Sequence, residues 1–512
     1  MKKILKPRFV VYLLFAVFGL SGCKKFLNVN PPLALSGNNF WKSSGDYEKF
    51  VLGLYVQFRS ATMGPRRGSD VYTQFFPAVG DFRCAPVTNQ VSGRDYIGAL
   101  ANNNLLYLTK NYTQWANGAP WQKDTDWGPF FKIIAGCNIM VDAINKDNGV
   151  LAPSEKGQYL GEAVFIRNLV FFMMARLYGD IPYSTKAFDQ NPQPRQNMVQ
   201  VLRNCYNDLQ AVVNDMPWTF DDPTQKGCRA MKGSALDLMM NIDMWCAGFD
   251  ANNKQTYWSQ TDSLGNVLLT QNGNSYYLLP MDQMHQVFKG GTPESLFEIR
   301  QSLNAGEQFN EFSTFADNVL AQPFKTATAT FAGYNQVFIK QDLFPDKNDK
   351  RWTTFFYEPP NNTDPFQMSY TKFTNVYAVP GEDVNPDDCQ MVFRLPDALL
   401  LRAEAAASLG HSDVAVQMLN TVRARAGAVL YQDGERPGYD LLDIIFYERC
   451  KELLGESYYF FDLVRTGRIM DPKFCYHPIS ENDFASGAWT WPISTNALIN
   501  NPGMQLNTYW SK

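Results

Sequence analysis

Apolar residues recur every three to four positions along several stretches of the chain, which is the spacing of one face of an α-helix. The clearest stretch, Glu155 to Tyr178, is apolar almost all round, as is typical of a helix buried between other helices. Gly179 ends it and Pro182 follows, a pattern that predicts a helix C-terminus. The same periodicity predicts further helices at 46–59, 127–144, 198–216, 230–247, 396–409, 413–426 and 440–454.

The helices predicted at 396–409 and 413–426 form a pair, because only a Gly-His-Ser turn separates them. So short a turn makes them antiparallel neighbours, and Ser412 is expected to cap the second helix. Several alanines in the first helix allow the close approach that stacked hairpins of the tetratricopeptide type require, although the strict consensus of that repeat is absent. We therefore predict a mostly α fold with tetratricopeptide-like helical hairpins as its scaffold.

Helical periodicity is lost in two long stretches, 61–126 and 275–393. The stretch 61–126 is rich in Gly, Pro and Asn with scattered aromatic residues, whereas parts of the stretch 275–393 have an irregular or β-containing pattern. Irregular stretches of such length inside a compact protein are more often functional surface than idle chain. We expect helices at about 40–60, 127–250 and 394–470 to form the scaffold and the two irregular stretches to form a ligand-binding face.

The first residues have the pattern of an export signal. Met1 to Arg8 carries four cations, and the apolar run Phe9 to Leu20 is too short for a membrane-spanning helix, which needs about 20 residues. Leu20 to Cys23 resembles the lipobox of bacterial lipoproteins, in which the signal is cut before a cysteine that is then acylated. By this resemblance residues 1–22 are a signal peptide and Cys23 carries a lipid anchor, so the chain works at a membrane surface outside the cytoplasm.

The composition allows a large core and argues against nucleic acid as a partner. Hydrophobic residues make up 45% of the chain and aromatic residues 14%, whereas charged residues make up 19%, below the roughly 25% of an average globular protein. A net charge of −4 provides no basic field for nucleic acid. Cys137 and Cys450 lie in apolar helical patterns and are expected to be buried thiols, while the pattern leaves the pairing of the other cysteines open.

The sequence carries no recognisable catalytic or cofactor-binding motif. His285, His411 and His477 are far apart and lack metal-ligand spacing, and no nucleophile elbow, phosphate loop or dinucleotide fingerprint occurs. The acidic run 381–388 has Asp where a calcium loop needs Gly, so we interpret it as an acidic surface turn. We therefore expect no cofactor and no metal.

Glu448 and Glu452 lie one helical turn apart and share a face of the last strong predicted helix. A glycosidase needs two carboxylates on opposite sides of the scissile bond in an open cleft, and neighbours on one apolar helix do not meet that need. We interpret them as members of a buried ion network with Arg449, Lys451 or Arg465.

Motifs spread over nearly the whole mature chain resemble those of the SusD/RagB family. They occupy Cys23–Pro32, Glu162–Ile181, Lys232–Ala235, Glu294–Ile299, Arg394–Glu404, Ile445–Glu456, Phe461–Gly467, Trp491–Ser494 and Asn501–Gly503. The resemblance implies an α-helical outer-membrane lipoprotein at the cell surface, with tetratricopeptide-like helix pairs and a more irregular ligand face. It implies a non-catalytic protein that captures oligosaccharides, or in some cases peptides, and sits as a lid on a SusC-like TonB-dependent transporter.

Ligand residues are expected in the two irregular stretches, because the glycan sites of this family combine aromatic rings with a few polar side chains. The candidates are Asp81, Arg83, Tyr112, Trp115 and Trp121 in the first stretch and, more weakly, Phe324 and Tyr334 in the second. Trp127 begins a predicted helix and is expected in the core instead.

The leading interpretation is a cell-surface glycan-binding lipoprotein with one SusD-like domain over residues 23–512, which delivers oligosaccharide to a SusC-like TonB-dependent transporter. Peptide capture by the same architecture is the alternative, and a surface glycoside hydrolase is a more remote one. The sequence leaves open which glycan, linkage and chain length are bound, because curvature in three dimensions selects among sugars.

Overall fold

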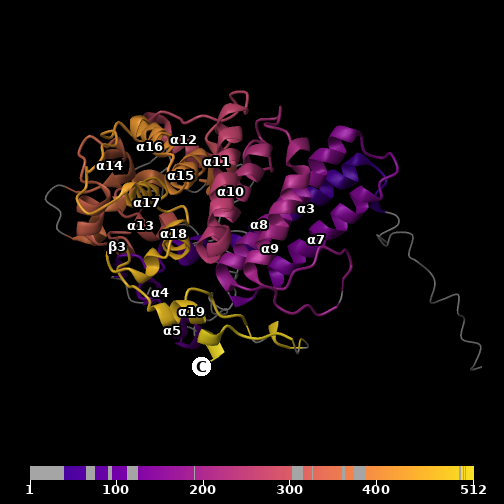
Figure 1. The fold of residues 1–512 in the computed structure, drawn as a ribbon, viewed down its shortest axis with the longest axis horizontal. Helices are drawn as coiled ribbons and strands as arrows, with labels where there is room; N and C mark the ends of the chain where they lie inside the picture. The colour runs from indigo at the N-terminus through magenta and orange to yellow at the C-terminus, as the bar shows by residue number, and fades with distance from the viewer. Residues whose placement is uncertain are drawn as a thin grey trace, which may run out of the picture.

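The computed structural model of the protein describes residues 40–64, 75–89, 95–111, 125–189, 191–301, 315–325, 327–359, 364–373, 388–494, 497–499, 501 and 503–511. Helices dominate these residues, and the long helices succeed one another across the molecule roughly in sequence order (Figure 1). The mostly α class predicted from the periodicity is confirmed.

The N-terminal part builds one side of the molecule from long neighbouring helices (Figure 1). Each packs on the next: α3 and α8 flank α7, α9 follows α8, and α10 lies between α9 and α11. Their bounds are α3 Ser44–Thr62, α7 Gly128–Asn145, α8 Pro153–Tyr178, α9 Met198–Val212, α10 Lys232–Phe249 and α11 Lys254–Thr270.

The C-terminal helices continue this array from α11 and build the opposite side (Figure 1). α15 packs on α11 and pairs with α16, and α17 packs on α15, so the predicted hairpin forms as expected. Ser412, however, is the first residue of α16 and its side chain does not cap the helix, since the residue before the helix is His411. The bounds are α15 Leu395–Ser408, α16 Ser412–Ala426, α17 Leu441–Glu452, α18 Tyr459–Arg465 and α19 Glu481–Ser486.

Helix α8 shows how the sequence sets the bounds of a core helix. Pro153 occupies its first turn, and the Glu155 carboxylate accepts a hydrogen bond from the Ala152 backbone N–H at 2.9 Å. From Tyr159 to Tyr178 nearly every residue is buried, as the all-round apolar pattern predicts. Gly179 then ends the helix with a φ of +73°, a conformation that glycine adopts readily.

Helix α11 is the long helix that the hydrophobic pattern did not predict. Only Tyr257, Thr261, Gly265 and Leu268 are fully buried along it, and its other residues are half-buried or exposed. Its apolar stripe is too narrow for a strong periodic signal, and packing on α10 and α15 stabilises it instead.

The two stretches expected to be irregular contain short elements. In the first are η1 Pro77–Asp81, a π-helical turn, and β1 Val87–Asn89, α4 Asp95–Ala101 and α5 Leu105–Asn111. The second contains α12 Met284–Lys289, β2 Ser295–Ile299, α13 Phe315–Val319, β3 Ala332–Tyr334, the π-helical turn η6 Phe338–Leu343, α14 Lys350–Phe355, β4 Phe356–Tyr357, β5 Ser369–Tyr370, η8 Thr371–Phe373 and β6 Gln390–Arg394. The minor β-structure predicted there is confirmed.

The strands of the described residues form three small antiparallel pairs: β1 with β3, β2 with β6, and β4 with β5. Strands β2 and β6 are buried along their whole length, and Ser295 lies opposite Arg394 while Ile299 lies opposite Gln390. Because β6 leads directly into α15, this pair fixes the start of the C-terminal helices against the chain that follows α12.

Candidate functional site

Asp81, expected to be a ligand residue, lies inside the scaffold. It ends η1 and is 1% exposed, and both carboxylate oxygens accept hydrogen bonds from the Ser457 backbone N–H, at 3.0 and 3.1 Å. Burial raises the pKa of Asp81 well above its usual range. A Cβ at Gly80 would lie 2.0 Å from the Ser457 hydroxyl, so the two segments are in close contact. Contrary to expectation, Asp81 is therefore placed to hold chain segments together.

Arg83 is also fully buried, and its guanidinium donates hydrogen bonds to the backbone of the C-terminal segment. It donates to the carbonyl oxygens of Trp489 at 2.7 Å and Ala488 at 2.8 Å, and its Nε donates to Asn103 Oδ1 at 2.9 Å. The group also lies 4.2 Å from the ring centroid of Phe460. Burial lowers the pKa of Arg83 to about 10. These donors face protein acceptors, so Arg83 is not presented to a ligand, against the sequence prediction.

The two aromatic candidates of the second stretch differ in accessibility. Tyr334 is 2% exposed and packs its ring on Phe315 and Tyr370, so it is a core residue and not the ligand residue expected. Phe324 is half-buried, with its ring edge-on to Tyr357 at 5.2 Å between centroids, and keeps part of its surface open. The remaining predicted residues, Tyr112, Trp115, Trp121 and Cys23, lie outside the described residues, and their assignment stays a prediction.

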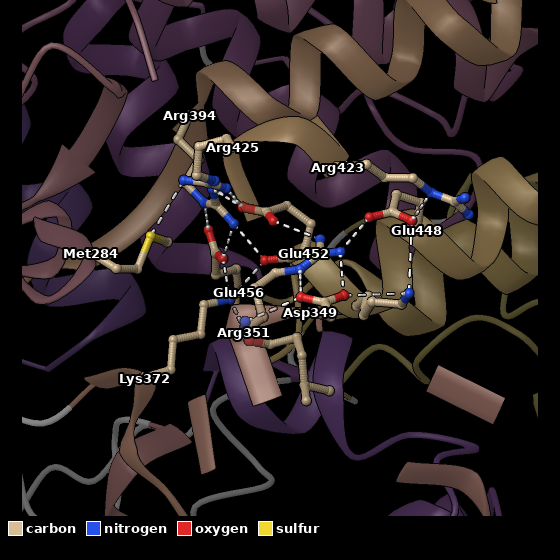
Figure 2. Close-up of polar contacts among 12 residues, drawn as sticks. Met284, Asp349, Arg351, Lys372, Arg394, Arg423, Arg425, Glu448, Glu452 and Glu456 are labelled. Atoms are coloured by element: carbon tan, nitrogen blue, oxygen red, sulfur yellow. Dashed lines mark hydrogen bonds and ion pairs between the residues drawn. The ribbon is translucent and has the colours of Figure 1, made fainter. Parts of the chain in front are cut away.

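A dense group of titratable side chains lies around Glu448 and Glu452 on α17, and Figure 2 shows that its members pair with one another. Arg351 bridges the two carboxylates, with its Nη atoms 2.6 Å from Glu448 Oε1 and 2.9 Å from Glu452 Oε2. Arg394 and Arg425 also pair with Glu452. Both carboxylates are buried, so they face fixed cations and not an open cleft.

The buried network was predicted, but most of its cations were not. Lys451 lies 3.8 Å from Glu448, as expected. Arg449 and Arg465 pair with Asp462 instead, at 2.9 and 2.8 Å. The cations that do surround the two glutamates are on α14, α16 and the end of β6, which only the tertiary fold brings together.

A further part of the network ties the chain that follows α17 to β6 and η8. Glu456 pairs with Arg394 Nε at 2.6 Å and with Lys372 Nζ at 2.6 Å, and Arg394 also reaches Glu294 at 2.9 Å. Burial lowers the pKa of Lys372 to about 8. Every one of these groups has fixed protein partners, so the network is scaffold and its carboxylates are not arranged for general acid and base chemistry.

An open pocket of about 400 Å³ lies elsewhere, between α7, the connection after α8 and the C-terminal segment. Its volume is in the range of about 300–1,000 Å³ typical of small-ligand sites. We call it the α7 pocket; it is lined by Trp127, Phe131, Ile134, Ala135, Asn138, Ile139, Pro182, Tyr183, Ser184, Lys186, Phe188, Asp189, Asn191, Gln193, Ala497, Ile499, Asn501 and Met504.

The inner wall of the α7 pocket is largely apolar. Trp127 is 5% exposed, which confirms the core position predicted for it, and its ring meets Phe131 edge-on at 5.5 Å. Asn138 is buried below them and accepts from Arg167 at 2.9 Å while donating to the Ser184 carbonyl at 3.0 Å. The amide therefore fastens the connection after α8 to the floor of the pocket.

The rim of the pocket is a polar loop held by Asp189. Its carboxylate accepts from the Ser184 hydroxyl at 2.9 Å and from the Asn191 side chain at 3.0 Å. The Ser184 hydrogen bond is the main reason that the pKa of Asp189 is lowered, so the group is anionic at neutral pH. Phe188 stands on this loop with 68% of its surface exposed and a φ of +57°, a conformation that is uncommon for a bulky residue and occurs often at binding sites.

The third wall comes from the far end of the chain. The Asn501 side-chain amide donates to the Gln193 carbonyl at 3.1 Å and so attaches the C-terminal segment to the rim. Ile499 adds an exposed apolar side chain at the edge. The pocket thus combines exposed apolar and aromatic surface with amides, a carboxylate and the Lys186 ammonium, a set suited to a polar ligand with apolar faces.

Sequence reasoning missed the α7 pocket because its three walls are far apart along the chain. The available signal was Phe188, an aromatic residue among polar neighbours in a connection between two helices.

Two further features are absent from the described part of the chain. No group of three or more His, Cys, Asp or Glu side chains there is arranged to hold a metal ion. No helix within the same residues combines the length and the apolar character that crossing a bilayer requires.

Family models match two consecutive parts of the chain. Residues 244–510 match the model described as the SusD family, and residues 82–234 match one described as starch-binding and associating with the outer membrane. Together they include the scaffold from α7 onward except for part of α10, and all the residues that line the α7 pocket.

Individual relatives extend this similarity to nearly the full chain. A SusD homologue from Bacteroides thetaiotaomicron is 37% identical, with 91% of this chain and 98% of that one covered and a TM-score of 0.82. The SusD-like protein P38 of Formosa agariphila is 25% identical over 99% of each chain. A laminarin-binding SusD-like protein shares the fold at 20% identity, with coverages of 91% and 99% and a TM-score of 0.66.

Proposed function

The chain belongs to the SusD family, and from this premise we propose that it captures oligosaccharide at the cell surface and delivers it to a SusC-like TonB-dependent transporter. The description of the second family model, starch-binding and associated with the outer membrane, supports a glycan ligand and this location. The laminarin-binding relative supports the same ligand class. Acylated Cys23 would supply the anchor in the outer membrane.

The observation that carries the proposal is the composition of the α7 pocket. The C–H faces of a sugar pack on rings such as Phe188, while its hydroxyls need directed partners such as Asp189 and Asn191. Asp189 and Ser184 are already joined, which fixes the polar rim before a ligand arrives and reduces the entropy cost of binding.

We further propose that binding occurs without catalysis. Glu448 and Glu452 are occupied by fixed cations inside the scaffold. Among the described residues that line the α7 pocket, Asp189 is the only carboxylate, and glycoside hydrolysis by the usual mechanisms needs a pair.

Tyr112, Trp115 and Trp121 remain proposed ligand residues. Trp121 precedes Trp127 by six positions, so at about 3.5 Å per residue their Cα atoms lie within about 21 Å of each other. This distance is short enough for one oligosaccharide to contact both the pocket and rings of this segment.

The test is calorimetric titration of the purified protein against a glycan panel that includes starch and laminarin fragments, with analysis of the products afterwards. We expect one glycan class to bind and to be recovered uncleaved. Phe188→Ala should weaken that binding by about tenfold, the scale of an aromatic anchor. Tyr277→Ala is the matched control, because Tyr277 is a ring of similar exposure outside the pocket.

Each alternative outcome has a distinct meaning. New reducing ends would contradict the non-catalytic proposal and favour a hydrolase, and binding of peptides alone would favour the peptide alternative. Glycan binding unaffected by Phe188→Ala would move the site away from the α7 pocket. For the partner, detergent-solubilised outer membranes should yield a TonB-dependent barrel with the full-length protein, and its absence would contradict the delivery step.

A further inference from the structure

A second open pocket, of about 580 Å³, lies between the start of α9, the end of α10, α19 and the C-terminal segment. Its volume is also within the range of about 300–1,000 Å³ that is typical of small-ligand sites. It has no lining residue in common with the α7 pocket. We call it the α19 pocket; its lining includes Arg195, Asn197, Phe249, Phe484, Trp489 and Gln505.

Part of the lining of the α19 pocket is a group of three aromatic rings. The rings of Phe249 and Phe484 are nearly parallel, with 11° between their planes and 6.0 Å between their centroids. The ring of Trp489 lies 5.0 Å from that of Phe249. Phe249 and Phe484 are only half-buried, so each keeps part of its apolar surface open. Rings of this kind are surfaces on which the C–H face of a sugar can pack.

The rest of the lining is polar, and hydrogen bonds between distant segments hold it in place. The Arg195 guanidinium donates from Nε to the Asp180 carbonyl at 2.6 Å and from Nη1 to the Gln505 carbonyl at 2.7 Å. The Asn507 side-chain amide donates to the Thr490 hydroxyl at 2.7 Å. The C-terminal segment is thus attached to two other walls before a ligand arrives, which lowers the entropy cost of binding.

The charged groups of the α19 pocket already have protein partners. Among the described residues that line it, Asp180 is the only carboxylate and Arg195 the only cation. The Asp180 carboxylate accepts from the Met198 backbone N–H at 2.8 Å, and the guanidinium donates to backbone carbonyls. The side-chain amides of Asn197 and Gln505, in contrast, belong to exposed residues. The lining therefore suits a neutral ligand with hydroxyl groups better than a charged one.

We propose that the α19 pocket is a second binding site for a sugar unit of the captured glycan. The proposal rests on the glycan capture proposed above and extends it, since the ligand would meet two separate pockets. Open aromatic surface, exposed amides and charges that are already paired are the features that carry it. Gly503 lines this pocket and Met504 lines the α7 pocket, so a single stretch of chain separates the two sites.

The test is peptide-resolved hydrogen–deuterium exchange of the full-length protein, with and without starch and laminarin fragments. The C-terminal segment borders both pockets, so the informative stretches are residues 484–490, which border only the α19 pocket, and residues 182–193, which border only the α7 pocket. We expect the fragments that bind to slow exchange in both stretches.

The pattern of protection separates this proposal from the proposed function. Fragments that bind without protecting residues 484–490 would overturn the second site, and protection of residues 182–193 alone would do so while leaving the proposed function intact. Protection of residues 484–490 alone would support the second site and contradict the placement of the first. A panel in which no glycan binds would contradict both.

Variants then assign the protection to the side chains. Phe484→Ala should raise the fragment concentration that half-protects residues 484–490 by about tenfold, the scale of an aromatic anchor, and leave that for residues 182–193 unchanged. Phe188→Ala should do the reverse. Phe474→Ala is the matched control, because Phe474 is a half-buried ring of the same part of the chain that lines neither pocket.

A second variant keeps the test valid if Phe484→Ala fails to fold. Gln505→Ala removes an exposed amide, and it should weaken the protection of residues 484–490 by about fivefold, the scale of one hydrogen bond. Thermal melts of each variant check that the fold is retained. Unchanged protection in folded Phe484→Ala or Gln505→Ala, or an equal loss in Phe474→Ala, would overturn the proposal.

Discussion

Replacement of Glu452 by alanine tests whether the network on α17 is scaffold. Glu452 is 0% exposed and holds three guanidinium groups: Arg394 at 2.7 Å, Arg351 at 2.9 Å and Arg425. Burial alone would raise the pKa of Glu452, but the arginines outweigh it and hold the pKa well below its usual range. The native protein therefore contains the carboxylate, and the variant leaves buried cations without one of their anions.

Removal of one partner from a buried ion pair costs about 3–5 kcal/mol, because the remaining charge is buried without compensation. Here Glu448, Glu456 and Glu294 still neutralise part of the positive charge, so we expect the loss to stay within that range. Unfolding entropy of about 2.1 cal/mol/K per residue gives about 1 kcal/mol/K for 512 residues. The melting temperature should thus fall by about 3–5 °C.

Thermal melts of the variant and of Glu435→Ala provide the comparison. Glu435 also pairs with a network arginine, at 2.9 Å from Arg423, but its side chain is 21% exposed, so its loss should cost less than about 1 kcal/mol. Glycan affinity should stay unchanged in both variants. An unchanged melting temperature in Glu452→Ala, or lost binding without destabilisation, would refute the reasoning and bring Glu452 into the site.

Three further predictions concern the anchor, the aromatic segment and acid sensitivity. Cys23→Ser should release a folded protein from the outer-membrane fraction, and retention of the variant without a partner barrel would contradict the anchor. Trp115→Ala or Trp121→Ala should weaken glycan binding by about 1–2 kcal/mol with unchanged melts if the rings stack on sugar, whereas destabilisation by about 3–5 kcal/mol would identify them as core. Because the folded pKa of Glu452 is lowered, its stabilising contribution is fully present above about pH 4.3 and is lost as the pH falls further, so the difference between the melting temperatures of wild type and Glu452→Gln should shrink as the pH is lowered below that value.

Much of the scaffold could be predicted from local sequence. The all-round apolar run that becomes α8, and the Gly-His-Ser turn between α15 and α16, each carry their signal within a few residues. Helix α11 carries no strong signal of this kind, and it is stabilised by packing on α10 and α15, which its own sequence does not reveal. Local patterns thus predict those elements whose stability is encoded locally.

The candidate site was predicted less well, because a side chain's role depends on what the fold places beside it. Arg83 stands in a Gly-Asp-Phe-Arg sequence that suggests an exposed ligand contact, yet its acceptors are carbonyls about 400 positions later. The burial of Glu448 and Glu452 was predicted because their own helix is apolar, but Arg351 comes from another segment. The α7 pocket was not predicted for the same reason, because the segments that form it are far apart along the chain. Its rim and third wall meet where Asn501 donates to Gln193.

The position of the charged network along the chain has a consequence for folding, if the protein is exported to the cell surface as proposed. On that route Arg351, Lys372 and Arg394 would leave the translocation channel before α17 and the residues just after it, with which they pair. Until that segment emerges, burial of these groups would leave their charges without partners. The cost of desolvating unpaired charges therefore favours an open, hydrated region. The hydrogen bonds of Arg83 would form even later, because their acceptors, the carbonyls of Ala488 and Trp489, lie near the C-terminal end of the sequence. On the proposed route we therefore expect the native state to form only when export is nearly complete, so the chain stays unfolded while it passes through the channel.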